Sequence, residues 1–228
     1  MRPTIAGWLA VLSLPLAGIA TAAEPVTWFD FHGGWSTYSM SDVNADIGSI
    51  NAQLAGSGLH MNEVSGGGAL GVALGLGLHR GFSLGAAYDR LSGSSEVGDA
   101  TGSIRYDLPA NAFRLFAEYA FNGQRASGAH VGASAGVVSE AGSVSLLGSG
   151  FGAINDIQGS GPLFEAFVGG DWLANRYVGL TGSAGLRAAK IEEIKINGTT
   201  VYLAPGRKEA VDYSGAFVRA GLKLVFPD

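Results

Sequence analysis

Residues 68–79 read GALGVALGLGLH, and in this stretch large side chains alternate with minimal ones. The even positions 70–78 carry only leucine and valine, whereas the odd positions 69–77 carry only alanine and glycine. A period of two is the period of a β-strand, because its successive side chains point to opposite faces. The stretch therefore predicts a strand with one oily face and one bare face, and it raises the question of which two environments those faces meet.

The same alternation recurs in seven further segments, at 27–39, 82–90, 111–122, 129–137, 163–173, 177–188 and 217–226. The connections between them alternate between short (79–81, 122–127, 174–176) and longer (41–64, 92–104, 139–161, 191–212). Short turns that alternate with long loops are typical of an up-and-down barrel. We therefore expect an all-β fold, an eight-stranded antiparallel up-and-down transmembrane β-barrel with short periplasmic turns and long extracellular loops.

A soluble β-sandwich or a lipocalin-like barrel is the alternative, because it also buries one face and wets the other. Apart from Arg90, the last residue of the segment at 82–90, the eight apolar faces carry no charged residue, and the opposite faces combine scattered charges with many glycines. Such small, mixed faces suit a narrow lumen better than a soluble exterior. Aromatic residues near the segment ends also fit the interfacial girdles of a membrane barrel. The residues expected in these girdles are Trp28, Trp35, Tyr88, Tyr119, Phe121, Trp172, Tyr177 and Phe226.

The composition limits the chemistry that the chain could perform. Charged residues make up 14% of the 228 positions, glycine occurs 37 times, and the formal net charge is -5. Because these charges are scattered along the chain, they form no nucleic-acid-binding patch. The chain contains no cysteine, which excludes disulfides, thiolate metal sites and cysteine nucleophiles. No cofactor is expected.

The N-terminal residues have the pattern of a secretory signal. Arg2 precedes an apolar run at 5–19, and the small residues 20–22 offer a cleavage site. A permanent membrane helix is disfavoured, because the run contains Pro15 and is shorter than the roughly 20 residues that a span needs. We expect a signal peptide at 1–23, removed from the mature protein, and one barrel domain at 24–228.

In this arrangement the chain resembles the small outer-membrane barrels of Gram-negative bacteria, of the OmpA transmembrane domain and OmpX type. The resemblance covers residues 26–226, and it includes a last strand whose apolar row ends in an aromatic residue, Leu222, Leu224 and Phe226. In that family such a strand is the signal read by the barrel-assembly machinery, although here Pro227 and Asp228 follow the phenylalanine. The resemblance implies export through the periplasm to the outer membrane, contact with outer-membrane lipid and lipopolysaccharide, and a monomer.

The charged residues of the strands fall on the faces predicted to line the lumen. Because an eight-stranded barrel is filled by its own side chains, unpaired charges there would be costly. Near-balance of sign therefore predicts internal ion pairs, with Glu165 close to Arg187 and Asp30 close to Lys223. The expected polar network consists of Asp30, His32, Asp89, Arg114, Glu118, Glu165, Asp171, Arg187, Arg219 and Lys223.

Catalytic and metal sites are not expected. Some small outer-membrane barrels are lipid A deacylases or palmitoyltransferases, and such chemistry needs a serine held by a histidine. His32 and Ser36 share a face, as do His130 and Ser134, but four residues along a strand span about 13 Å. The chain also lacks an HExxH pattern and clustered carboxylate ligands.

The first long connection, 41–64, contains a helical pattern. Ser41 or Asp42 is a candidate N-cap, and the apolar residues that follow recur at helical intervals. These residues are Val43, Ile47, Ile50 and Leu54. The helix would either pack on the neighbouring loops or cover the barrel mouth as a lid.

Two other loops carry recognisable features. The loop at 139–161 is apolar and glycine-rich, which predicts a flexible or tightly folded segment without a phosphate-binding pattern. Asn197-Gly198 predicts the tip of a hairpin that extends the last two barrel strands.

These features predict a structural or surface-interaction protein that acts through its extracellular loops, with a lumen plugged by ion pairs. The alternative is a narrow channel, or a conduit for small hydrophobic or amphipathic solutes like that of OmpW-type barrels, with the helix at 41–64 as its lid. A lipid-modifying enzyme is the third hypothesis.

Overall fold

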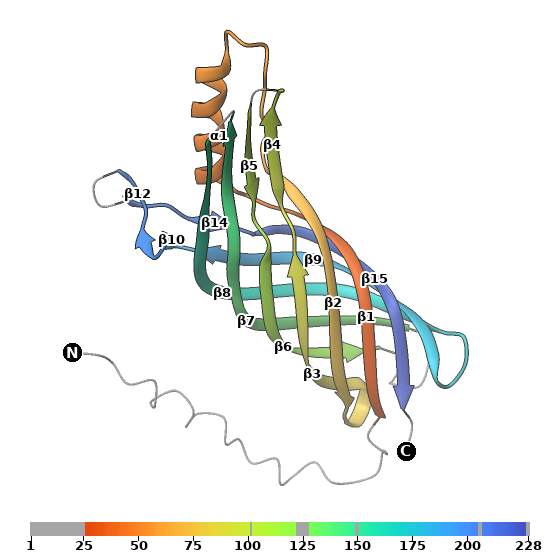
Figure 1. Ribbon diagram of the computed structural model, residues 1–228. Helices are drawn as coiled ribbons and strands as arrows, with labels where there is room; N and C mark the ends of the chain where they lie inside the picture. Colours follow the sequence, from red (N-terminus) through yellow and green to blue (C-terminus); the bar gives the residue numbers. More distant parts are fainter. Residues whose placement is uncertain (1–25, 101, 122–127, 149–150, 205–206, 227–228) are drawn as a thin grey trace, which may run out of the picture.

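The computed structural model describes residues 26–100, 102–121, 128–148, 151–204 and 207–226. Eight antiparallel strands form a closed ring, because the last one pairs with the first (Figure 1). The predicted fold class is therefore confirmed. In their order around the ring, the strands are β1 (Val26–Thr37), β2 (Gly66–Gly77), β3 (Phe82–Leu91), β6 (Ala110–Ala120), β7 (Gly128–Gly148), β8 (Phe151–Leu173), β9 (Val178–Ile191) and β15 (Gly215–Phe226).

The strands are strongly staggered around the ring. A path through paired residues leaves β7 at Ser139, crosses every other strand once and returns to β7 at Ala129, so the stagger is the ten residues between positions 139 and 129. Stagger, strand number and diameter are linked in a closed barrel. Eight strands leave an interior that side chains fill, so the content of the lumen decides what passes.

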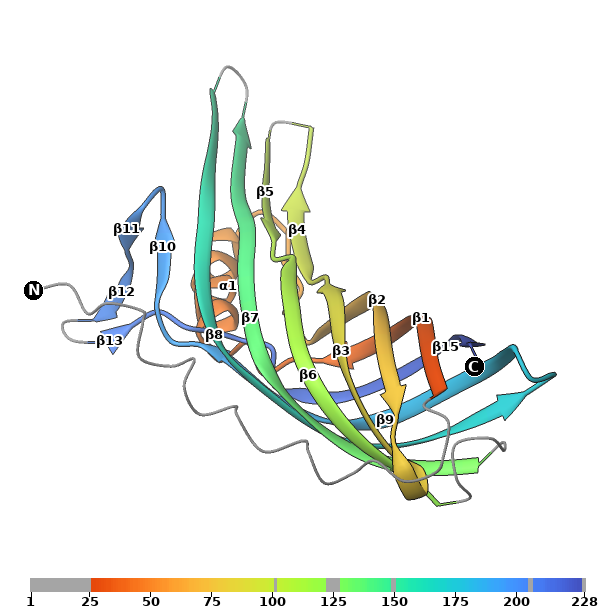
Figure 2. The ribbon, with the colours of Figure 1, turned by 90° about the horizontal axis from the view of Figure 1, so that it is seen from below.

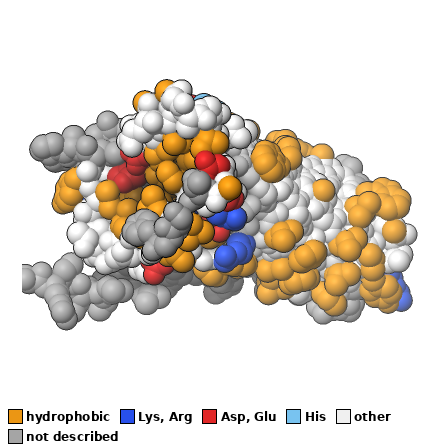
Figure 3. Space-filling model, turned by 45° about the horizontal axis from the view of Figure 1, so that its top comes forward, with side chains coloured by type: hydrophobic (Ala, Val, Ile, Leu, Met, Phe, Trp, Pro, Cys, Tyr) orange, Lys and Arg blue, Asp and Glu red, His pale blue; other side chains and the backbone are white. Residues whose placement is uncertain are grey.

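The two faces of β2 meet the two environments that its sequence predicts. Leu70, Leu74 and Leu76 point outward with 42–63% of their surface exposed, whereas Ala69 and Ala73 are buried. The other strands follow the same rule, and Figure 3 shows hydrophobic side chains over the barrel wall. We call this surface the apolar belt. At the end of the barrel that carries the segment 41–64, the belt ends and the outward positions hold polar residues, Ser92, Ser139, Ser160 and Lys190.

The prediction that Trp28 belongs to an aromatic girdle is wrong. Trp28 lies inside the barrel, 7% exposed, with its ring against Phe116 and beneath the ammonium group of Lys223. Position 28 has the parity of Asp30 and His32, so the alternation of β1 points it inward. Room for its ring exists because Gly75 lies opposite it on β2.

Two of the predicted loops are largely β-structure. Residues 139–148 and 151–161 continue β7 and β8 as paired strands, so the expectation of a flexible or tightly folded loop is wrong for these residues. These residues pair between β7 and β8, but their many glycines mask the alternation that would predict a strand. The segment 92–104 contains β4 (Ser94–Gly98) and the start of β5 (Gly102–Asp107), and β5 pairs with the extension of β7. Both hairpins rise beyond the ring (Figures 1 and 2).

The remaining short elements lie in turns and in the last long connection. The predicted short turn at 79–81 is a 3₁₀ segment, η3 (His79–Gly81). Asn197 and Gly198, both at positive φ, form the predicted hairpin tip between β10 (Ile194–Ile196) and β11 (Thr199–Thr200). Strand β10 of this hairpin continues the line of β9, the seventh barrel strand, along β8 as predicted, whereas β11 pairs with β10 and does not extend β15. The others are β12 (Tyr202–Ala204), β13 (Arg207–Lys208) and β14 (Val211–Asp212).

The predicted helix exists as α1 (Ser41–Leu54), and it lies at the barrel mouth (Figure 1). Its Val43 and Ile47 are buried in the main hydrophobic cluster, while Ile50 and Leu54 pack against that cluster from its edge. The prediction of a side-chain N-cap at Ser41 or Asp42 is wrong. Met40 occupies the N-cap with φ 26°, and no side chain caps the helix.

Three predictions concern residues outside the described ones. They are the signal peptide at 1–23, the turn at 122–127 and the final Pro227 and Asp228. Within the described residues, no helix is long and apolar enough to cross a membrane.

The bare face of β2 leads to a prediction. A Cβ atom at Gly75 would lie 2.2 Å from the Trp28 ring, inside the barrel. We expect Gly75→Phe to prevent refolding, whereas Leu76→Phe, on the exposed face of the same strand, refolds like the parent chain. The readout is the difference in gel mobility between heated and unheated samples after refolding in detergent. Equal refolding yields of the two variants would contradict the placement of the two faces.

Candidate functional site: the lumen of the barrel

The centre of the lumen is occupied by a layer of arginines and carboxylates, which we call the central layer. Asp89 and Glu165 have fully buried side chains, and three arginines converge on them. The residues of the layer come from six of the eight barrel strands. They are His32 on β1, Asp89 on β3, Arg114 on β6, Glu165 on β8, Arg187 on β9 and Arg219 on β15.

Glu165 is the hub of the central layer. It accepts hydrogen bonds from Arg187 Nε at 2.8 Å and from Arg219 at 2.7 and 3.1 Å, and Arg114 Nε lies 3.0 Å away. Ser134, on β7, also donates its hydroxyl to Glu165. Charged hydrogen bonds of this kind offset the cost of desolvating the ions only when the geometry is good on all sides. The layer is therefore a polar block that fixes strand positions.

Asp89 is the second anion of the central layer. It bonds to Arg114, lies 3.4 Å from Arg219, and has His32 Nε2 at 2.7 Å. A Cβ atom at Gly71 would lie 2.3 Å from the carboxylate of Asp89 and 2.6 Å from His32. The bare row of β2 thus makes room for this pair.

Aromatic contact compensates the excess of guanidinium groups. The ring of Phe217 lies 4.0 Å from Arg219 and 5.5 Å from Arg187, with 3% of its surface exposed. A ring face attracts a cation, most strongly where water is absent. Phe217 therefore stabilises the arginines at the border between the central layer and the apolar cluster.

A second polar group lies between the central layer and the end of the barrel with the short turns. Lys223 Nζ contacts Asp171 at 2.5 Å and lies 4.2 Å above the Trp28 ring, and His130 Nδ1 lies 3.9 Å from Asp171. Glu118, Asp171 and Lys223 line one small cavity. The adjoining cavity below the central layer has about 50 Å³, room for a few water molecules.

The structure places all ten residues of the predicted polar network on the inner face of the barrel wall. Glu165 lies directly opposite Arg187, as expected. Asp30 is opposite Lys223 in register, but the lysine contacts Asp171, and Asp30 lies 3.4 Å from His32. The network thus divides into two groups, which a list of lumen-facing charges does not reveal.

The histidines of the barrel wall are engaged with carboxylates. His32 faces Asp89 and Asp30, and His130 lies 3.9 Å from Asp171. The hydroxyl of Ser134, four residues after His130 on the same face of β7, donates to Glu165. Among the residues that the structure describes, no group of three or more His, Asp or Glu side chains could hold a metal ion. In the described wall, neither His32 nor His130 is hydrogen-bonded to a serine hydroxyl.

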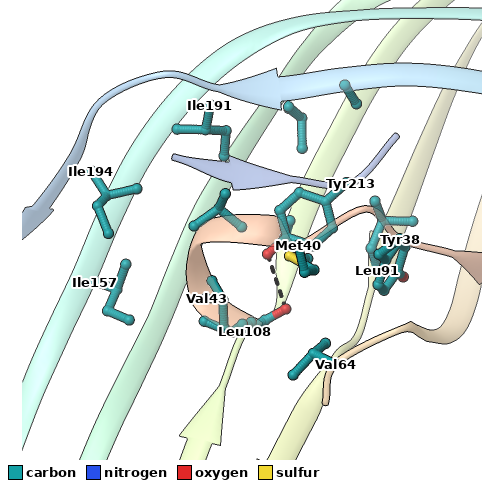
Figure 4. Close-up of a cluster of buried hydrophobic side chains, with 14 of the residues drawn as sticks. Tyr38, Met40, Val43, Val64, Leu91, Leu108, Ile157, Ile191, Ile194 and Tyr213 are labelled. Atoms are coloured by element: carbon teal, nitrogen blue, oxygen red, sulfur yellow. Dashed lines mark hydrogen bonds between the residues drawn. The ribbon is translucent and has the colours of Figure 1, made fainter. Parts of the chain in front are cut away.

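Above the central layer, residues 40–64 fill the barrel mouth, and we call them the plug. Met40, Val43, Ile47, Met61 and Val64 are at most 2% exposed. They pack on the wall and on Tyr213, whose hydroxyl donates to the carbonyl of Leu108 (Figure 4). The lumen is therefore occupied at two levels, by the ions of the central layer and by the hydrocarbon side chains of the plug.

Two asparagines bind the plug to itself. Asn44 donates to the carbonyl of Val64 and accepts from its amide, and Asn51 does the same with Met61, at 2.7–3.2 Å. The helix and the returning chain therefore form one unit. These two residues were not predicted from the sequence, although asparagines seven positions apart on one helix face are a detectable signal.

The chain shows no match to a family model and none to a curated protein. Among solved structures, it is similar to Ail, the attachment invasion locus protein of Yersinia pestis, crystallised with the heparin analogue sucrose octasulfate. The two share 7% identity over 90% of this chain and 100% of Ail, with a TM-score of 0.52. This chain has the barrel fold of Ail.

Two other solved structures align over similar lengths. Neisserial surface protein A has 14% identity over 90% of this chain and 99% of its own, with a TM-score of 0.49. OprG from Pseudomonas aeruginosa has 13% identity over 91% and 97%, with a TM-score of 0.43.

The hub position of Glu165 leads to a prediction. Glu165→Gln leaves three buried guanidinium groups with Asp89 as their main anion, so we expect the free energy of unfolding to fall by about 3–5 kcal/mol. Glu96→Gln is the matched control, because Glu96 pairs with Arg105 at 3.5 Å on the surface and should contribute less than about 1 kcal/mol. Urea unfolding of the refolded proteins, followed by tryptophan fluorescence, measures both. Equal losses for the two variants would show that the central layer is not a stabilising unit.

Proposed function

We propose that this protein is an integral outer-membrane β-barrel with a closed lumen, acting in a structural or surface-interaction role through its extracellular part. The observation that carries the proposal is the occupation of the lumen at these two levels inside an apolar wall. An apolar belt without charges suits lipid, and a lumen blocked by the central layer and the plug does not suit permeation.

The part of the protein beyond the belt supports a role at the surface. The extensions of β7 and β8, with β4, β5, β10 and β11, form a sheet outside the ring. In this proposal the end that carries α1 faces the exterior and the short turns face the periplasm. The sheet then presents its hairpins to partners outside the cell, and nothing in the barrel wall has to move.

The conduit for hydrophobic solutes has one observation in its favour. A groove of about 360 Å³ lies between the end of α1 and the strands beyond the belt, with apolar residues along it. These residues are Leu54, Leu59, Val97, Ile104, Leu146 and Leu147. A solute held there would still meet the plug and the central layer, so this hypothesis requires both to open.

Insertion in a bilayer is tested by charge on the belt. Leu74 is 54% exposed in the belt, and Leu147 is equally exposed on the β7 extension beyond it. We expect Leu74→Arg to cost roughly 2–4 kcal/mol near the bilayer midplane and Leu147→Arg to change little. Urea titrations of folding into lipid vesicles give both values. A similar cost for both variants would contradict the membrane position of the belt.

Closure of the lumen is tested by conductance. We expect the refolded protein to give no steady openings in a planar lipid bilayer, because ions would have to displace both the plug and the central layer. Steady nanosiemens-scale openings would overturn the closed-lumen proposal and favour the channel hypothesis.

A further inference from the structure

Three carboxyl groups lie in a row between the plug and the barrel wall. Asp46 belongs to α1, Glu209 to the last long connection, and Glu140 to β7 one residue beyond the polar edge of the belt. Glu209 precedes Ala210, whose amide donates to Asp42 on α1, and it interacts electrostatically with both Asp46 and Glu140. The row therefore crosses the contact that holds the plug in place.

The two carboxyls on the wall side are deeply buried. Glu140 is 4% exposed and Glu209 is 7% exposed, and both side-chain oxygens of Glu140 lack a hydrogen-bond partner. Among the described side chains, no lysine, arginine or histidine forms an ion pair with either residue. An ionised carboxylate without a partner is costly to bury, so this packing favours the protonated forms.

Lys195 of β10 and the neighbouring Glu193 line the same surface pocket as Glu140, and the other titratable groups described around the row are acidic or phenolic. Asp42, on α1, accepts a hydrogen bond from the amide of Ala210 and adds negative charge beside Asp46 and Glu209. Tyr106 of β5 faces Asp46 and Glu209, and Tyr213 faces Glu140. Farther away, Arg187 acts on Tyr38 but is bonded to Glu165 and Ser36.

We propose that Glu140 and Glu209 form a protonation switch that seats the plug in the barrel mouth when they are neutral and loosens it when they ionise. The plug is suited to such a movement, because the bonds of Asn44 and Asn51 hold it together as a unit. Its hydrogen bonds to the last connection include those from Ala210 to Asp42 and from Met40 to Asp212, and Ser95 of β4 donates to the carbonyl of Asn62.

The direction of the pH dependence follows from the environment of the two groups. Burial, and then the charge of Glu209, raises the pKa of Glu140 to about 8. Burial, and then the charge of Asp46, raises the pKa of Glu209 to about 7. In a loosened state both groups face water with ordinary values near 4.5. The seated state is thus most favoured below about pH 4.5 and loses that advantage as the pH rises through 7 and 8. Between pH 4.5 and these raised pKa values, each of the two groups shifts the equilibrium between the seated and the loosened state roughly tenfold per pH unit.

The absence of native cysteine allows a direct test with single thiols. Ile47→Cys places a thiol on the fully buried face of α1, and Ser49→Cys places one on its exposed face. The refolded full chain in detergent micelles reacts with a maleimide between pH 5.5 and 9. The ratio of the two rates removes the pH dependence of the thiol itself. We expect this ratio to rise at least tenfold, and a constant ratio overturns the proposal.

Carboxyl variants test whether these two groups are responsible. Glu140→Gln and Glu209→Gln, combined with each thiol, should make the rate ratio nearly constant with pH. Glu96→Gln, at an exposed carboxylate, should leave the rise unchanged. If Glu140→Gln fails to refold, as judged by gel mobility, Glu209→Gln alone must reduce the rise. An undiminished rise in Glu209→Gln overturns the proposal, whatever the result of the conductance test.

Discussion

The barrel depends on placing two carboxylates, Asp89 and Glu165, where no water reaches them. Each must find its cations within the lumen, and those cations come from strands far apart in the sequence. Arg114 and Arg219 contact both anions, and Arg187 contacts Glu165. A shift in register of any of the three strands that carry these arginines would therefore leave a buried charge unpaired. The ion pairs thus specify one arrangement of the ring. The apolar belt decides which face of each strand points outward.

Room for these side chains is created by residues that have almost none. Gly71 makes room for the contact between His32 and Asp89, and Gly75 makes room for Trp28. The bare row of the stretch at 68–79 is thus the complement of large groups on β1 and β3. Its leucines meet the opposite requirement, because they face outward into the belt. Glycines on the inner faces of the strands thus let a narrow cylinder hold long charged and aromatic side chains.

Local pattern predicted the parts of the structure in which each residue faces one environment. The period of two located the eight strands and their inward and outward faces, and helical spacing located α1. The pattern failed where pairing and partners decide. Parity alone pointed Trp28 inward, but its position near a strand end suggested a girdle. The glycine-rich segment 139–161 showed no strand signal, because its stability comes from cross-strand pairing. The row from Asp46 to Glu140 joins three distant segments, and no spacing in the sequence announces it.

The plug and its seat come from opposite ends of the chain. The plug connects β1 to β2, whereas the segment with Glu209 and Tyr213 leads into β15, and the contact from Ala210 to Asp42 spans 168 positions. Tyr38 and Tyr213 meet across the same gap, with ring centroids 5.2 Å apart. The plug follows β1 in the chain, and the segment with Glu209 and Tyr213 precedes β15. These two strands pair with each other to close the ring, and their pairing has the greatest loop-closure cost. The seat of the plug is therefore complete only after the last strand has joined the first, so that the same packing that closes the mouth also fastens the seam.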